Sequence, residues 1–127
     1  MEEYKFGHGF LEIEKAWGKE EIVVSNELYC FKRLSFNKGG ALSMHFHVDK
    51  HETWEIISGR GLFAYYNYAT GKLQTRILRE GDVVTIPNHQ LHRFEAHEDT
   101  IINEVSTQDK FTDSYRTIPS GKVDVDK

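Results

Sequence analysis

The sequence predicts a single all-β domain folded as a jelly-roll barrel, and two features carry this prediction. Short runs rich in β-branched and aromatic residues alternate with turns of Gly, Asn, Asp and Pro along most of the 127 residues, a punctuation typical of β-sandwiches and barrels. Several of these runs alternate between apolar and polar side chains, and helix-like periodicity is weak throughout. We expect one domain over residues 1–127, with its core at about 17–106 and a polar tail at 107–127.

Strands are expected wherever such a run is bounded by turn residues. The stretch 65–74 predicts a hairpin with its turn at 69–72, where Gly71 supplies a positive φ. The tail has room for one short helix or strand around 111–116 before it frays. The expected strands cover residues 21–24, 28–36, 41–47, 54–57, 62–68, 73–78, 83–86, 92–96 and 100–105.

Composition and charge exclude several classes of function. Apolar residues make up 39% of the chain and aromatic residues 13%, which suffices for one core without suggesting a membrane protein. The formal net charge of -4, with no run of Lys and Arg, argues against nucleic acid as a partner. No run is long and apolar enough to span a bilayer, and residues 1–5 lack the features of a secretion signal. We therefore expect a cytoplasmic protein, in which the lone Cys30 is a buried, inert thiol.

Four side chains have the spacing of a metal site. His45 and His47 lie one residue apart on an expected strand, so their imidazoles point the same way. Glu52 precedes the next strand, and His92 begins a later one. Imidazole nitrogen and carboxylate oxygen are ligands that hold divalent zinc, iron, manganese or nickel. The sequence therefore predicts one divalent metal ion bound by His45, His47, Glu52 and His92.

The strand that carries two of these histidines has two different faces. Residues 42, 44, 46 and 48 are apolar, whereas 41, 43, 45 and 47 are small or imidazole side chains. On later strands Glu52 shares a face with Trp54, and His92 shares one with Phe94. A jelly-roll barrel explains this pattern, because polar ligands reach into a partly aromatic interior near one opening. Trp54 is expected to pack beneath the metal ion.

These segments resemble the two sequence motifs of the cupin family, at residues 39–59 and 81–92. The first motif matches at every signature position. The second departs twice, with His89 where a glycine is usual and Ala96 where an asparagine is usual. The glycine position is a tight turn, and histidine tolerates a positive φ better than most residues do. The resemblance implies a cupin double-stranded β-helix that binds a metal ion.

A narrower resemblance is to the small type II phosphomannose isomerase domains of this family, including those attached to mannose-1-phosphate guanylyltransferases. In that group the metal is held by a Gln, a His, a Glu and a second His, at positions that match His45, His47, Glu52 and His92. This chain departs from the group with His45 for Gln, Lys50 for Arg and Thr53 for His, changes that keep the metal but touch the pocket. The other matching features are Ala16-Trp17-Gly18, Lys32-Arg33-Leu34, Gly39, Leu42-Ser43, Trp54, Ser58-Gly59, Ile86-Pro87, Arg93-Phe94-Glu95 and Glu104-Val105.

The narrower resemblance implies an isomerase that acts on a sugar phosphate such as mannose 6-phosphate or fructose 6-phosphate. The chemistry would pass through an enediol that the metal ion stabilises. Zinc is the favoured ion, and iron, manganese and nickel are alternatives. The partner would be a small carbohydrate or sugar phosphate. Cupin barrels commonly pair through their sheets, so a homodimer is also implied.

An isomerase needs a group that carries a proton between two carbons. Glu104 matches a glutamate of the family, and we assign it this catalytic role, with a structural role for a buried, partnered carboxylate as the equal alternative. His51 and His89 are weaker candidates. A solvated loop explains the first, and a turn at the rim of the barrel explains the second.

A phosphate on the substrate needs cationic side chains. We assign Lys50 and Arg116 to this role, Arg116 because the resemblance places an arginine at a similar point in the tail. Lys32 and Arg33 are further possible donors. For each of them, a solvated charge or a salt bridge at the rim is the alternative reading.

Two rival functions stay open at this point. Three histidines and a glutamate also suit a cupin dioxygenase that uses ferrous iron, and His45 in place of glutamine favours it. The second rival is a non-catalytic module that binds a carbohydrate or metabolite, because the sequence has no unambiguous general base.

Overall fold

The computed structural model describes residues 6–110 and 112–126, and these ranges contain strands and turns but no helix. No segment there qualifies as a helix able to cross a membrane. The strands are β1 (Leu11–Lys15), β2 (Gly18–Ser25), β3 (Cys30–Phe36), β4 (Gly40–Ala41), β5 (Met44–His47), β6 (Glu52–Ser58), β7 (Arg60–Asn67), β8 (Lys72–Arg79), β9 (Val83–Ile86), β10 (His92–Ala96), β11 (Thr100–Ser106), β12 (Ser114–Ile118) and β13 (Gly121–Lys122).

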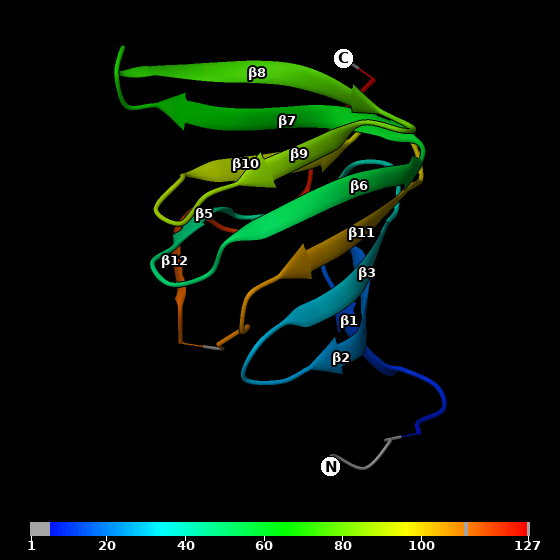
Figure 1. The fold of residues 1–127 in the computed structure, drawn as a ribbon. Helices are drawn as coiled ribbons and strands as arrows, with labels where there is room; N and C mark the ends of the chain where they lie inside the picture. The colour runs from blue at the N-terminus through cyan, green and yellow to red at the C-terminus, as the bar shows by residue number, and fades with distance from the viewer. Residues whose placement is uncertain (1–5, 111, 127) are drawn as a thin grey trace.

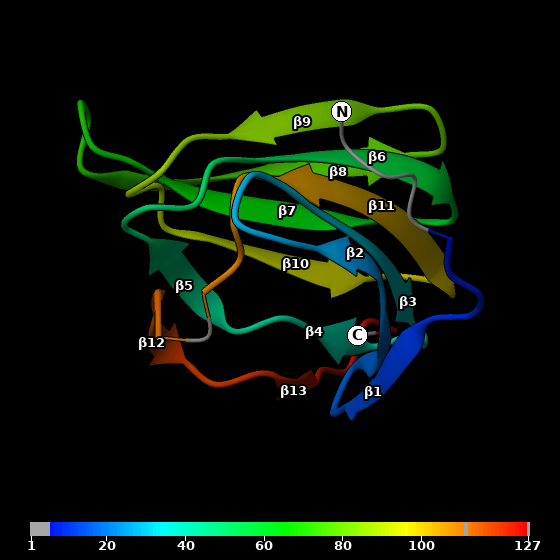
Figure 2. The same cartoon turned by 60° about the horizontal axis from the view of Figure 1, so that its bottom comes forward.

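These strands form two antiparallel sheets (Figures 1 and 2). The first sheet has 6 strands in the order β1-β2-β3-β11-β6-β9. The second has 7 strands, in the order β12-β5-β10-β4-β13, with β7 beside β10 and β8 beside β7. From β5 to β12 the chain changes sheet at every connection except the β7–β8 hairpin, which is the wrapping of a jelly roll. The predicted all-β jelly-roll fold is confirmed.

Most expected strands lie where they were predicted, and the hairpin turn has Gly71 at φ 71°. Strand β1 was not predicted, because its alternation of Leu11 and Ile13 with glutamates is short and its side chains are largely exposed. Its pairing with β2 through the backbone is what makes it a strand. The tail does not fray after residue 116, since β12 pairs with β5 and β13 pairs with β4. Residue 111 lies outside the described ranges.

The predicted strand at 41–47 is interrupted, and the interruption aims the histidines. Ala41 pairs with Glu95 of β10, and His45 pairs with His92. Between these two pairs, the segment from β4 to β5 covers four residues, whereas β10 covers three. The segment from β4 to β5 therefore contains one extra residue, as in a β-bulge. Paired residues share a face of a sheet. Ala41 and His45 therefore lie on opposite faces, and the expectation that residues 41 to 47 alternate without a break is wrong.

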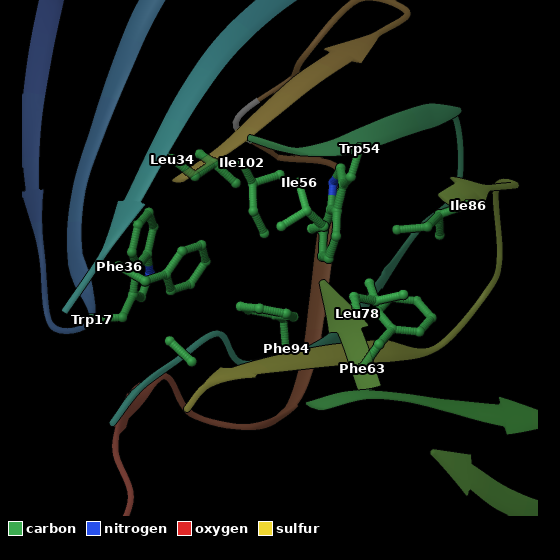
Figure 3. Close-up of a cluster of buried hydrophobic side chains, with 11 residues drawn as sticks. Trp17, Leu34, Phe36, Trp54, Ile56, Phe63, Leu78, Ile86, Phe94 and Ile102 are labelled. Carbon is green, nitrogen blue, oxygen red and sulfur yellow. The ribbon is translucent and has the colours of Figure 1, made fainter. Parts of the chain in front are cut away.

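A cluster of buried apolar side chains fills the space between the two sheets (Figure 3). Trp17 stacks on Phe36 with ring centroids 4.4 Å apart, and Phe36 meets Phe94 of the other sheet at 5.1 Å. Trp54 is 1% exposed, which confirms it as a core residue. Its ring lies 5.6 Å from that of His92, so the predicted metal ligands border the core.

Candidate metal centre

Three of the predicted ligands converge where β5 and β10 pair. His92 stands opposite His45, and His47 follows two residues later on β5. One ligand nitrogen from each ring lies within 4.8 Å of the other two. His92 and His45 are buried, and His47 is half-buried.

Each of the three imidazoles is oriented by a backbone carbonyl. The distances are 2.7 Å from His45 Nδ1 to Ser43 O, 2.7 Å from His92 Nδ1 to Gln90 O, and 3.0 Å from His47 Nδ1 to Asp113 O. A carbonyl oxygen can only accept a hydrogen bond, so each Nδ1 carries the proton and donates it. Each Nε2 of the neutral ring therefore presents a lone pair, which is how metal-binding histidines are commonly oriented.

Glu52 brings a carboxylate against two of these rings. Its Oε1 lies 3.3 Å from His92 Nε2, and its Oε2 lies 3.6 Å from His47 Nε2. With the proton on Nδ1, both contacts place one acceptor against another. Within the described ranges, Glu52 Oε1 and His92 Nε2 have no hydrogen-bond partner, and the cation that Glu52 Oε2 meets is the Lys50 ammonium group at 3.2 Å. Buried polar atoms in this arrangement need a cation between them. The residues present therefore fit a divalent ion, which the three Nε2 atoms and the Glu52 carboxylate would hold.

The electrostatics of the site favour the protonation states that such an ion requires. Burial, together with the nearby His92, lowers the pKa of His45 to about 3. Burial and the charge of Lys50 lower the pKa of His47. Burial alone would raise the pKa of Glu52, but the positive charge of Lys50 helps to lower it below the ordinary value. His45 and His47 are therefore neutral and Glu52 is ionised at neutral pH.

Lys50 and Glu104 lie buried beside Glu52. Lys50 Nζ is 3.2 Å from Glu52 Oε2, 3.4 Å from Glu104 Oε2 and 3.3 Å from Asp109 Oδ1. Trp54 Nε1 donates to Glu104 Oε1 at 3.1 Å. The ammonium group of Lys50 has three N–H donors and faces three carboxylates, so it can meet a phosphate only if one of them moves away.

Burial raises the pKa of Glu104, and the charge of Glu52 raises it further, against the opposing charges of Lys50 and Lys32. For Lys50, burial would lower the pKa, but the charges of Glu104, Glu52 and Asp109 raise it above the ordinary value. Glu104 is thus a buried carboxyl group with a perturbed proton affinity, as found for acids and bases in active sites.

A cavity of about 440 Å³ leads to this cluster between the two sheets. His45, His47, Lys50 and Glu104 line it. Arg116 also lines it, from an exposed position on β12 directly opposite His45 in the pairing of β12 with β5. The structure therefore gathers all the predicted catalytic residues around one cavity beside the predicted metal ligands.

Of the other sequence candidates, Lys32 lines the same cavity, whereas His51, Arg33 and His89 lie elsewhere in the described ranges. His51 is exposed, and its backbone N–H donates to Thr107 Oγ1. Arg33 lies 3.8 Å from Glu21 and over the ring of Phe10. His89 has φ 70°, which confirms that it takes over the tight turn of the usual glycine.

Two aspartates of the tail were missed from the sequence. Asp109 pairs with Lys32 as well as with Lys50. The Asp113 carboxylate accepts from the backbone N–H groups of residues 48, 49 and 50 at 2.9, 3.1 and 3.0 Å, while its carbonyl orients His47. Both aspartates lie in a polar segment without a motif, so no sequence pattern marks them.

The two facing sheets and the inward cluster of three histidines define a jelly-roll barrel with a site suited to a divalent metal. The family model described as Cupin matches residues 16–122. The chain therefore belongs to the cupin family, and the resemblance of its two motifs is confirmed.

Two relatives are mannose-1-phosphate guanylyltransferases. The protein of Escherichia coli is 36% identical over 50 residues, which are 39% of this chain and 11% of that protein. The ManC protein of Salmonella typhimurium is 26% identical over 88 residues, which are 69% of this chain and 17% of that protein. The chain thus matches only a small part of the length of these relatives.

Solved structures share the fold at low sequence identity. The capsular polysaccharide assembling protein CapF from Staphylococcus aureus has a TM-score of 0.76 at 16% identity, covering 89% of this chain and 35% of that chain. Oxalate decarboxylase from Bacillus subtilis, a protein with Mn(II) centres, has a TM-score of 0.70 at 22% identity, covering 83% of this chain and 29% of that chain.

Proposed function

We propose that the protein is a metal-dependent isomerase of a sugar phosphate, of the kind that interconverts mannose 6-phosphate and fructose 6-phosphate. One observation carries the proposal. Buried Glu104 lines the same cavity as His45 and His47, so a proton-transferring group and a metal-binding cluster border one space. The partial likeness to mannose-1-phosphate guanylyltransferases supports a sugar phosphate as the ligand. The cavity of about 440 Å³ lies within the roughly 300–1,000 Å³ of small-molecule sites.

The residues divide the work as follows. His45, His47, Glu52 and His92 would hold a divalent ion, with zinc favoured over iron, manganese or nickel, and this ion would supply a Lewis acid for the sugar oxygens. Glu104 removes the proton from carbon 2 of the open-chain aldose and returns it to carbon 1, while the hydroxyl proton on carbon 2 passes to the oxygen on carbon 1. Trp54 Nε1 fixes the orientation of that carboxyl group. Arg116, exposed at the cavity, attracts the anionic substrate. Lys50 contacts the carboxylates of Glu52 and Glu104 and holds them in position.

Isotope exchange tests this proposal. The metal-loaded protein is incubated with mannose 6-phosphate in deuterated water and followed by NMR. We expect fructose 6-phosphate to form and deuterium to enter at carbon 2 of the recovered mannose 6-phosphate. Glu104→Gln should abolish the exchange while the metal content stays the same. The matched control Glu55→Gln, at an exposed position on β6, should leave both unchanged. Absence of exchange and conversion in the wild type would leave a non-catalytic binding module.

A second candidate is an iron(II)-dependent dioxygenase. Three imidazoles and one carboxylate around one position favour it, since nitrogen and oxygen ligands of this kind suit ferrous iron. Oxygen uptake by the iron-loaded protein, measured with an electrode in the presence of candidate substrates, would support this activity over the isomerase.

The proposal includes a homodimer, taken from the resemblance to cupin barrels that pair through their sheets. Ile57, Val83 and Val105 are exposed on the first sheet, which supports such pairing. Light scattering should give twice the mass of the 14.8 kDa chain. A monomer at micromolar concentration would contradict it.

A further inference from the structure

We propose that Lys32 and Lys50 form the binding site for the phosphate group of the substrate, and that Asp109 fills this site as an internal competitor when no substrate is bound. The site deepens the proposed function, because the identification of the anion as the phosphate of a sugar rests on it.

The Asp109 carboxylate bridges the two ammonium groups. Its Oδ2 lies 2.6 Å from Lys32 Nζ, and its Oδ1 lies 3.3 Å from Lys50 Nζ. Both lysine side chains are buried, at 10% and 5% exposure. A phosphate group also presents two or more acceptor oxygens on one central atom, so it can bridge the same pair of donors.

Two buried cations so close together require an anion between them. The charge of Lys50 lowers the pKa of Lys32. Burial would lower the pKa of Lys32, but the charges of Glu104 and Glu20 raise it above the ordinary value. Both lysines are therefore charged at neutral pH, and the space between them selects for negative charge.

Four carboxylates contact Lys32 and Lys50, and Asp109 is the one that an incoming anion can displace most easily. The other three carboxylates that contact these lysines, Glu20, Glu52 and Glu104, lie on β2, β6 and β11, whereas Asp109 follows β11 outside any strand. Its side chain is also the most exposed of the four, at 26% against 10%, 1% and 6%. Like both lysines, Asp109 lines the cavity that leads to the histidine cluster.

The charges of the network agree with such an exchange. Lys32, Lys50 and a divalent ion together balance the charges of the four carboxylates when all of these are ionised. If the Asp109 side chain rotates into the solvent, the two lysines, the divalent ion and the three remaining carboxylates have an excess positive charge. The phosphate then supplies the missing negative charge. The substrate must therefore compete with Asp109, which weakens its binding to the wild-type protein.

Titration of the metal-loaded protein with inorganic phosphate in a calorimeter tests the competitor. Asp109→Ala should bind phosphate about tenfold more tightly than the wild type. Asp109→Asn keeps the shape of the side chain and should shift the affinity in the same direction, in case the alanine variant loses its fold by circular dichroism. The matched control is Asp49→Ala, which removes an aspartate paired with exposed Lys110. An affinity in both Asp109 variants no higher than that of the control would overturn the proposal.

A second pair of variants separates this site from direct binding of phosphate to the metal ion. Lys32→Met should lower phosphate affinity at least tenfold. Lys15→Met is the control. Lys15 lines the same cavity and pairs with Glu20 at 3.4 Å, as Lys32 does at 2.6 Å, but it makes no ion pair with Asp109 within the described ranges. Equal affinities in the two lysine variants would place the phosphate elsewhere and refute the site.

The two proposals fail separately. Phosphate binding needs no turnover, so tighter binding in Asp109→Ala without isotope exchange in the wild type supports the anion site and removes the isomerase. Isotope exchange in the wild type without any effect of the Asp109 variants on phosphate binding supports the isomerase and refutes the anion site.

Discussion

Every histidine of the cluster takes its orientation from a main-chain oxygen, so the backbone fold sets the site. Sequence spacing indicated the four candidate ligands because His45 and His47 are two residues apart on a strand and Glu52 and His92 begin strands. The oxygen that orients His47 belongs to Asp113, 66 residues away in the chain. No local pattern connects these two positions, which is why the sequence could indicate the candidate ligands but not the groups that orient them.

Removal of one ligand should empty the site. His92→Ala is expected to weaken metal binding by more than the roughly 10–100-fold that loss of an outer orienting partner costs. Elemental analysis of the purified variant measures this, with His97→Ala as the matched control that should keep its metal. Full metal content in His92→Ala would mean that the second motif does not bind the ion.

The indole N–H of Trp54 should contribute to stability through Glu104. Trp54→Phe keeps an aromatic ring but leaves Glu104 Oε1 without this donor, so we expect a loss of about 1–3 kcal/mol beyond the packing cost. Trp17→Phe is the control, because the Trp17 indole makes no hydrogen bond within the described residues. Urea unfolding of both variants measures the difference, and equal losses would contradict the expectation.

At the scale of elements, the pairing between strands determines features of the fold that the local sequence pattern did not predict. Strand β1 is short, its side chains are largely exposed, and its pairing with β2 makes it a strand. The extra residue between β4 and β5 becomes visible only in the register against β10, although it turns His45 toward the interior. By contrast, the buried positions of β3 alternate without a break, and this strand was predicted from the sequence.

The turn between β5 and β6 should depend on the ionised form of Asp113. Burial would raise the pKa of Asp113, but hydrogen bonds from the backbone of residues 48–50 lower it below the ordinary value. A lowered pKa in the folded state stabilises the protein above the unfolded pKa of about 3.9, and this stability is lost as the pH falls through the folded pKa.

Asp113→Ala should therefore cost about 2 kcal/mol at pH 7 and progressively less below about pH 4. Urea unfolding in the presence of a chelator, at a series of pH values, measures this without a contribution from metal. Asp49→Ala should cost less than about 1 kcal/mol, since its ion pair is exposed. A cost for Asp113→Ala that does not change with pH would show that its charge is not involved.

At the scale of the whole molecule, the two sheets are not closed against each other along either side. The cavity with the histidines lies on the side of β1, β2 and β12. A second cavity of about 310 Å³ lies between the edge strands β8 and β9, lined by residues such as Phe63, Leu78 and Val84. The number of strands and their alternating apolar and polar faces predicted a barrel. The positions of its openings depend on the order of the strands in each sheet, which no single segment encodes.

Metal binding should stabilise this half-open barrel as a unit. A free ion at about 100 times its dissociation constant adds about 2.7 kcal/mol, which should raise the melting temperature by roughly 10 °C for a domain of this size. Calorimetry with and without a chelator measures the shift. His47→Ala should abolish it, and an equal shift in that variant would place the ion elsewhere.

Fluorescence of the two tryptophans of the chain can report whether a metal ion occupies the site. Trp54 meets the His92 ring edge-on at 5.6 Å, whereas Trp17 stacks on Phe36 among the apolar residues of the core. A paramagnetic ion such as manganese or iron would quench the emission of the nearer indole, while diamagnetic zinc would leave it bright. Fluorescence of the Trp17→Phe variant would thus discriminate between the candidate metals during the titration itself.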